Sequence, residues 1–113
     1  MKIGSISGLV HASGDLDRTA AFYETLGFRP GKRTEHDYTC YINWFWLTFS
    51  TEADGATASG PVLYLKVDDL DDAYGFVQAN GITTLDEPHK DKAGRRVFTL
   101  ADPDGNRLAF FTK

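Results

Sequence analysis

Two segments of the chain carry apolar residues at helical spacing. In the first, Leu16, Ala20 and Tyr23 recur at intervals of three and four residues. The second segment has the same pattern, with Leu70, Ala73, Tyr74 and Val77. Residues at this spacing share one helix face, so each segment is expected to form an amphipathic helix. An aspartate precedes each segment (Asp15 and Asp69), which places an N-cap candidate at each predicted start.

The two helical segments are copies of one unit. The sequence Asp-Leu-Asp at 15–17 recurs at 69–71, an offset of 54 residues (69 − 15), and the same offset relates Gly27 to Gly81. Each glycine suits the left-handed position that closes a helix. A period near half of a 113-residue chain indicates an internal duplication, because a solenoid needs at least three repeats.

Between the helices the pattern changes to aromatic and β-branched runs that alternate with period two, which is typical of strands. The expected strands are Ile3–Ser13, a short one from Phe28 broken at Pro30-Gly31, Tyr38–Ile42, Trp44–Phe49, Pro61–Val67, Ile82–Leu85, Arg96–Leu100 and Asn106–Thr112. Residues 87–94 read as a charged loop and 102–105 as a hairpin turn. Each half is therefore β-α-β-β-β, with module one at 1–51, a small polar linker at 52–60 and module two at 61–113, together forming a single domain.

Alternation also separates the two faces of each predicted strand. The side expected to pack under the helices carries Phe45, Leu47, Phe49, Leu63, Leu65, Val67, Leu108 and Phe110. The opposite side carries Trp44, Trp46, Thr48, Val62, Tyr64, Lys66, Arg107, Ala109 and Phe111. His11 falls on the helix side, where its counterpart 54 residues later is Leu65.

Composition narrows the class of protein. The chain is 42% hydrophobic and 25% charged, as ordinary globular proteins are, and it has neither a membrane-span pattern nor the apolar core of a signal peptide. The net charge is −4, with no basic cluster longer than two residues, so we expect neither nucleic acid nor a membrane as partner. Cys40 is the only cysteine; an unpaired thiol suits a reducing cytoplasm, and its apolar strand suggests a small core residue.

The duplicated module, the wording Asp-Leu-Asp-x-x-x-x-Phe-Tyr-x-x-x-Gly-Phe from Asp15 and the closing Asp-Pro-Asp-Gly-Asn from Asp102 point the same way. Across essentially its whole length the chain resembles the vicinal oxygen chelate superfamily, also called the glyoxalase, bleomycin-resistance and dioxygenase group. The resemblance implies an α+β fold, in which two β-α-β-β-β modules form curved mixed sheets with the helices on the convex side. It also implies a homodimer and a ligand cup, but no particular activity, because this fold carries several chemistries.

The resemblance also indicates where metal ligands would lie. The family's metalloenzymes take them from a position seven residues before each capping aspartate and from the middle of the last strand of each half. Those positions here are Gly8, Val62, Thr48 and Ala109. None has an imidazole or carboxylate, the ligands that such divalent ions need. We therefore expect no metal site and no cofactor, and the resemblance is to the metal-free, drug-binding side of the superfamily.

Three functions remain open from the residues. The first is a metal-free cytosolic homodimer that binds a small aromatic or drug-like molecule, with ligand-binding candidates Trp44, Trp46, Tyr64, Lys66, Arg107 and Phe111. The second is an enzyme, either metal-free with acid–base chemistry near Lys66, Tyr64 or Arg107, or with an unconventional metal site that would involve histidines such as His11. The third is a structural dimer whose cups are filled by their own aromatic side chains.

Overall fold

The computed structural model of the chain describes residues 1–2, 4–52 and 61–112. The chain divides into two compact units, Met1–Ala56 and Thr57–Lys113, here called unit 1 and unit 2. Both the linker predicted at 52–60, apart from Glu52, and the boundary between the units lie outside the described residues.

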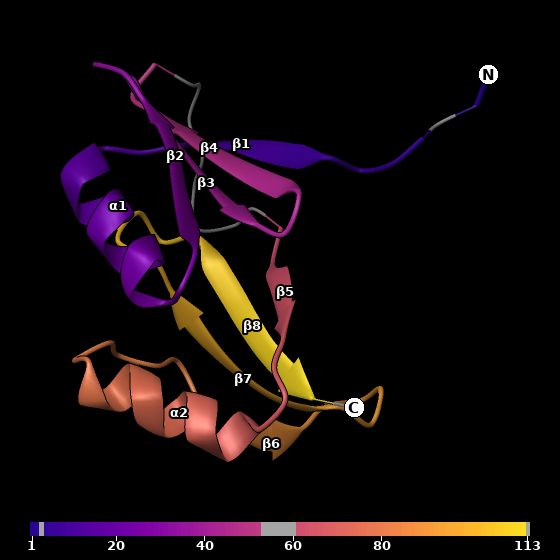
Figure 1. Cartoon of the computed structure of the whole chain (residues 1–113). Helices are drawn as coiled ribbons and strands as arrows, with labels where there is room; N and C mark the ends of the chain where they lie inside the picture. The colour runs from indigo at the N-terminus through magenta and orange to yellow at the C-terminus, as the bar shows by residue number, and fades with distance from the viewer. Residues whose placement is uncertain (3, 53–60, 113) are drawn as a thin grey trace. The chain divides into compact units, whose positions relative to one another are not determined.

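Each unit has the predicted β-α-β-β-β order (Figure 1). Unit 1 consists of β1 (Gly8–Ala12), α1 (Leu16–Thr25), β2 (Arg29–Arg33), β3 (Asp37–Ile42) and β4 (Phe45–Ser50). Unit 2 consists of β5 (Leu63–Lys66), α2 (Leu70–Ala79), β6 (His89–Lys90), β7 (Arg96–Ala101) and β8 (Arg107–Thr112). The sheet orders are β1-β4-β3-β2 and β5-β8-β7-β6, with one parallel pair in each, β1 with β4 and β5 with β8. Both sheets are therefore mixed, and the predicted fold class is confirmed.

Both helices start and stop where the sequence predicts. The side chain of Asp15 accepts a hydrogen bond from the backbone N–H of Arg18 (3.2 Å), and Asp69 caps α2 in the same way through Asp72 (3.0 Å). Such bonds satisfy N–H groups that a helix leaves without partners. At the other ends Gly27 and Gly81, just beyond the last helical turns, have φ of 102° and 73°, which glycine adopts without steric cost.

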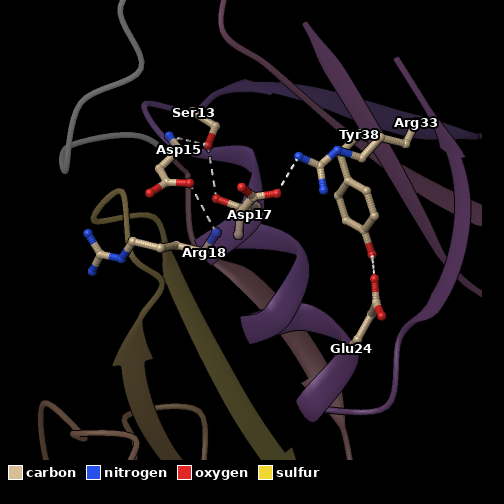
Figure 2. A network of polar contacts seen from close by, with 8 residues as sticks. Ser13, Asp15, Asp17, Arg18, Glu24, Arg33 and Tyr38 are labelled. Carbon is tan, nitrogen blue, oxygen red and sulfur yellow. Dashed lines mark hydrogen bonds and ion pairs between the residues drawn. The ribbon is translucent and has the colours of Figure 1, made fainter. Parts of the chain in front are cut away.

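Polar contacts also fasten α1 to its sheet (Figure 2). The hydroxyl of Tyr38 on β3 donates to a carboxylate oxygen of Glu24 at 2.8 Å, and Arg33 on β2 pairs with Asp17 at 2.7 Å. The Arg33–Asp17 pair is exposed and contributes little to stability. The Tyr38 side chain is buried, so its hydrogen bond orients a group that would otherwise lack a partner.

The core of each unit lies between its helix and its sheet. In unit 1 the ring of Tyr23 on α1 packs 4.7 Å from that of Phe49. In unit 2 the rings of Phe98 and Phe110 stack at 5.2 Å, and Tyr74 on α2 meets Phe98 edge-on. These residues and the predicted partners Leu47 and Leu108 lie on the helix side of the strands, as alternation indicates. The opposite side of each sheet, which its own helix does not cover, is called the helix-free face below.

The first strand prediction of unit 1 is wrong in its bounds. Of the predicted Ile3–Ser13, Ile3 lies outside the described residues, and the strand spans Gly8–Ala12, where it pairs with Trp46 to Ser50 of β4. The break predicted at Pro30-Gly31 is a register irregularity against β3 between Pro30 and Arg33, and β2 continues across it to Arg33.

The strand predicted at Ile82–Leu85 is also wrong. Only Thr84 forms a bridge there, with Leu100 on β7. The backbone N–H of Thr99 donates to a carboxylate oxygen of Asp86 (2.6 Å), so it is not available to continue the ladder. Pairing with β7 resumes at β6, which lies inside the segment predicted as a charged loop.

Candidate functional site

Trp46 dominates the helix-free face of unit 1. It lies on β4 in register with Gly8 of the parallel strand β1, and its indole is partly exposed. A Cβ atom at Gly8 would overlap with the indole ring atoms of Trp46. The indole therefore fills the space that a side chain at position 8 would need.

A second aromatic side chain lies beside Trp46 on this face. Tyr41 on β3 is directly opposite Trp46, and the guanidinium carbon of Arg29 lies 5.0 Å from the centre of the Tyr41 ring. Arg29 also donates to the carbonyl of Asn43 at 3.2 Å, which fixes its position over the ring. Tyr41 and Arg29 were not among the predicted site residues. For Tyr41 the available signal was alternation in the predicted strand Tyr38–Ile42, which puts Thr39 and Tyr41 on one face.

Trp44 is not on a strand. The expected strand Trp44–Phe49 begins at Phe45, because Asn43 and Trp44 form the two-residue turn between the paired residues Ile42 and Phe45. Asn43 has φ of 53°, which asparagine tolerates better than most residues. The alternation that put Trp44 on the same face as Trp46 therefore does not apply, and Trp44 is 73% exposed in the turn.

The four remaining predicted residues lie on the helix-free face of unit 2, and two of them touch. The rings of Tyr64 on β5 and Phe111 on β8 meet at an interplanar angle of 67° with centres 5.9 Å apart. Lys66 is in register with Phe111. Arg107 starts β8 opposite Ala101, two residues before Ala109, the register partner of Tyr64.

Arg95 joins this group, and the sequence analysis missed it. Its guanidinium carbon lies 5.0 Å from the centre of the Tyr64 ring and 5.9 Å from that of Phe111. It comes from the turn before β7, which alternation along the strands does not reach. The available signal was the pair Asp91 and Arg95, four residues apart around Gly94, which predicts a local ion pair.

Asp91 holds Arg95 in place. One of its carboxylate oxygens accepts from the backbone N–H groups of Ala93 (2.9 Å) and Arg95 (3.0 Å), and the other accepts from Nε of Arg95 (3.2 Å). Desolvation acts to raise the pKa of Asp91, but these hydrogen bonds and the charge of Arg95 outweigh it and lower the pKa. The carboxylate that orients Arg95 therefore stays ionised at neutral pH.

Two buried titratable groups, Cys40 and Tyr38, lie on β3 of unit 1. Burial, and secondarily the charge of Glu24, raise the pKa of the Cys40 thiol to about 12. Burial and the hydrogen bond to Glu24 also raise the pKa of Tyr38. Cys40 is fully buried, so its prediction as a core residue is confirmed. Neither group is a reactive nucleophile or base at neutral pH.

The histidines are dispersed. His11 lies on the helix side, as predicted, where its ring stacks 5.7 Å from that of Phe49. His36 contacts Thr51, and His89, which was expected in a loop, forms part of β6. Within the residues that the structure describes, no three side chains of the metal-ligating types form a group that could hold a metal ion.

Comparison with known proteins identifies the family. The model of the Glyoxalase/Bleomycin resistance protein/Dioxygenase superfamily matches residues 5–110 of the chain. The chain belongs to this superfamily. The resemblance drawn from the duplicated motif is thereby confirmed.

Individual members of the superfamily are similar to the chain over nearly its full length. Metallothiol transferase FosB of Lysinibacillus sphaericus is 26% identical over 99% of this chain and 84% of its own. The crystal structure of a bleomycin resistance determinant encoded on transposon Tn5 is 25% identical, with a TM-score of 0.77, and covers 97% of this chain and 98% of its own. A bleomycin-binding protein complexed with bleomycin is also 25% identical, with a TM-score of 0.76 and coverage of 97% and 99%.

Three of the four positions that hold metal ligands in the superfamily's metalloenzymes have structural roles here. Gly8 makes room for Trp46, and the hydroxyl of Thr48 hydrogen-bonds that of Thr39 at 2.7 Å. Ala109 is fully buried between β5 and β7, and Val62 precedes β5 with its aliphatic side chain partly exposed. None of the four side chains offers a donor group suited to a divalent ion.

Proposed function

We propose that this superfamily member binds a small, flat aromatic molecule without the help of a metal ion. The overlap between Trp46 and the space above Gly8 carries the proposal. The position where a metalloenzyme of the superfamily has its first ligand is here covered by a partly exposed indole. An indole on an open sheet face offers a stacking surface, and Tyr41 beside it extends that surface.

The helix-free face of unit 2 supports the same function. Tyr64 is 48% exposed and packs against Phe111, so an aromatic surface is also available there. Lys66 and Arg107 are exposed on this face and have no ion-pair partner among the described residues. Binding sites for small molecules combine such apolar surface with a few polar groups that fix orientation.

One relative agrees with this proposal, and the name of another points to metal-dependent chemistry. One solved structure shows a protein bound to bleomycin, and that protein is 25% identical to this chain across almost all of both sequences. The other relative, FosB, is named as a metallothiol transferase, but this chain has no imidazole or carboxylate at the four ligand positions. Binding rather than metal-dependent transfer is therefore the function that the residues support.

Calorimetric titration of the EDTA-treated protein with a library of planar aromatic compounds tests the proposal. We expect saturable binding that Trp46→Ala weakens about tenfold, since loss of the indole removes both a stacking partner and buried apolar area. Trp44→Ala is the matched control. It removes the same side chain two residues away, from the exposed turn, and should leave the affinity within about twofold of the wild type.

Two results would contradict the proposal. If no compound binds saturably, the aromatic faces serve packing alone. If binding appears only after a divalent metal is added, the protein is a metal-dependent member of the superfamily, despite Gly8, Thr48, Val62 and Ala109.

We further propose that the protein acts as a cytoplasmic homodimer. Closed two-fold dimers are the commonest oligomers of soluble proteins, and Ile6 and Val10 are exposed apolar side chains that could enter a symmetric contact. The unpaired thiol of Cys40 suits a reducing compartment. No helix in the described ranges is long and apolar enough to cross a membrane.

Light scattering at micromolar concentration should give twice the chain mass of 12.5 kDa, whereas a monomer would overturn the dimer.

A further inference from the structure

The turn that carries Arg95 is built so that its guanidinium lies over aromatic rings. The carboxylate of Asp91 accepts hydrogen bonds from the backbone N–H groups of Ala93 and Arg95. The backbone N–H of Asp91 donates to the carbonyl of Arg95 at 2.8 Å, which closes the turn. The same carboxylate holds Nε of Arg95. Both the backbone and the side chain of Arg95 are thus fixed by one residue, so its position over Tyr64 and Phe111 carries little entropic cost on binding.

Most of the hydrogen-bonding capacity of Arg95 is unused. A guanidinium has five N–H donors, and Asp91 takes the one on Nε. In the described part of the chain no hydrogen bond reaches the Nη atoms of Arg95. The side chain is 40% exposed, so these N–H groups can reach a molecule on the face. A fork of this shape matches a carboxylate, sulfonate or phosphate group.

The charges around these rings favour an anion. Lys66 is in register with Phe111, and no ion pair from the described residues reaches it. Asp91, the carboxylate in contact with Arg95, binds Nε and leaves the Nη groups of the guanidinium to face a ligand. Arg95 and Lys66 therefore present positive charge beside an aromatic surface.

We propose that the helix-free face of unit 2 recognises a planar aromatic anion, with its acidic group held by Arg95 and Lys66 and its ring against Phe111. This rests on the proposed function and adds the charge of the ligand to it. In this assignment Arg95 is the main determinant of specificity, and Asp91 is a positioning residue that acts through it.

A matched pair of probes tests the assignment. 8-Anilino-1-naphthalenesulfonate and N-phenyl-1-naphthylamine have the same ring system, but only the first has an anionic group. We expect the native protein to bind the sulfonate more tightly. Arg95→Gln should weaken sulfonate binding about tenfold, the effect of losing one charge-assisted contact, and leave the neutral probe within about twofold.

Arg96→Gln is the matched control for the loss of charge. Arg96 is the next residue but pairs with Asp71 of α2, on the other side of the sheet, so its loss should change neither affinity beyond about twofold. Arg95→Lys keeps the charge without the fork and should retain part of the preference for the sulfonate. If circular dichroism shows that Arg95→Gln does not fold, Arg95→Lys replaces it. The expected result is then loss of at least half of the preference for the sulfonate over the neutral probe. An unchanged preference overturns the assignment.

The other outcomes separate this inference from the proposed function. If Arg95→Gln binds both probes like the wild type while Trp46→Ala weakens them, the assignment of Arg95 is overturned and aromatic binding stands. An equal loss of both probes in Arg95→Gln also overturns the assignment, since it would show a packing role. If neither probe binds the wild type saturably, both this inference and the proposed function fail.

Discussion

Three of the four positions that would hold a metal ion, Gly8, Thr48 and Ala109, are occupied by residues with packing roles of their own. Gly8 lies under an indole, and Thr48 is bound to Thr39 across a strand pair. Ala109 is completely buried. A donor side chain introduced at any of these positions would have to displace an existing contact. At these three positions the packing of the helix-free faces therefore takes the place of a metal ligand.

Gly8→Ala should destabilise the protein. The added methyl group would overlap with the indole of Trp46, and overpacking of this kind costs about 1–3 kcal/mol. Urea denaturation should show a lower midpoint with an unchanged slope. In a Trp46→Ala background the space is vacant, so there Gly8→Ala should cost less than about 1 kcal/mol. Equal costs in the two backgrounds would show that the indole does not occupy this space.

The thiol of Cys40 should be unreactive in the native protein. Burial raises its pKa to about 12, so at pH 8.5 the thiolate fraction is about a thousandfold below that of an ordinary cysteine. Iodoacetamide should therefore label the native protein very slowly and the guanidinium-unfolded protein rapidly, as mass spectrometry would show. The raised pKa also makes the free energy of unfolding depend on pH. Above about pH 9 the thiol ionises in the unfolded state but not in the native state, so the free energy of unfolding falls as pH rises. Rapid labelling of the native protein would show that Cys40 is accessible.

Among the elements, the helices are the part of the fold that local sequence determines most fully. Caps, apolar spacing and closing glycines all act within a few residues, and α1 and α2 have the bounds that these features predict. Strand bounds depend on partners far along the chain. The predictions for β3, β7 and β8 agree within one residue, but those for the first strand and for Ile82–Leu85 failed. The interruption between Thr84 and β6 follows from Asp86, whose carboxylate binds β7 in place of a strand partner.

The N-cap of α1 gives a direct test of the local signal. Asp15→Ala removes the acceptor for the Arg18 N–H and should cost about 1 kcal/mol of unfolding free energy. Asp17→Ala, two residues later, is the control, because it removes an exposed ion pair that contributes little. Thermal melts of the two variants compare them. A cost for Asp17→Ala at least as large as for Asp15→Ala would mean that the ion pair, and not the cap, stabilises this helix end.

Site residues on strands could be placed from alternation, and those outside strands could not. Trp46, Tyr64 and Phe111 lie on the predicted face because period two fixes their side. Trp44 and Arg95 both lie in turns, where side-chain direction depends on turn geometry and on contacts such as that of Asp91 with Arg95. Alternation therefore placed Trp44 wrongly on a strand face and did not find Arg95, whose guanidinium lies over the rings of Tyr64 and Phe111.

At the scale of the whole molecule, the duplicated unit has kept its topology and changed its chemistry. Both units have the same strand order and capped helix. Gly8 pairs with Trp46 in unit 1, and the residue equivalent to Gly8 in unit 2 is Val62. Because Leu63 pairs with Leu108, Val62 is aligned with Arg107, so Arg107 is the counterpart of Trp46. The two faces therefore differ at this equivalent position, with an indole in unit 1 and a guanidinium in unit 2.

Neither unit should be stable alone. A unit of roughly 55 residues, with one helix on a four-stranded sheet, buries too little apolar surface for independent stability. Fragments 1–59 and 60–113 should each give circular dichroism melts without a cooperative transition. A cooperative melt from either fragment as a monomer would show that the chain consists of two domains rather than one.

Native mass spectrometry tests the central claim, ligand binding without a metal, most directly. The protein would be treated with EDTA, mixed with the best-binding aromatic compound from the calorimetric screen and transferred intact to the gas phase. The account predicts peaks with the mass of protein plus ligand and no added metal, and an unchanged bound fraction when zinc, nickel or manganese is supplied. Ligand-bound peaks that appear only together with the mass of a metal ion would contradict it.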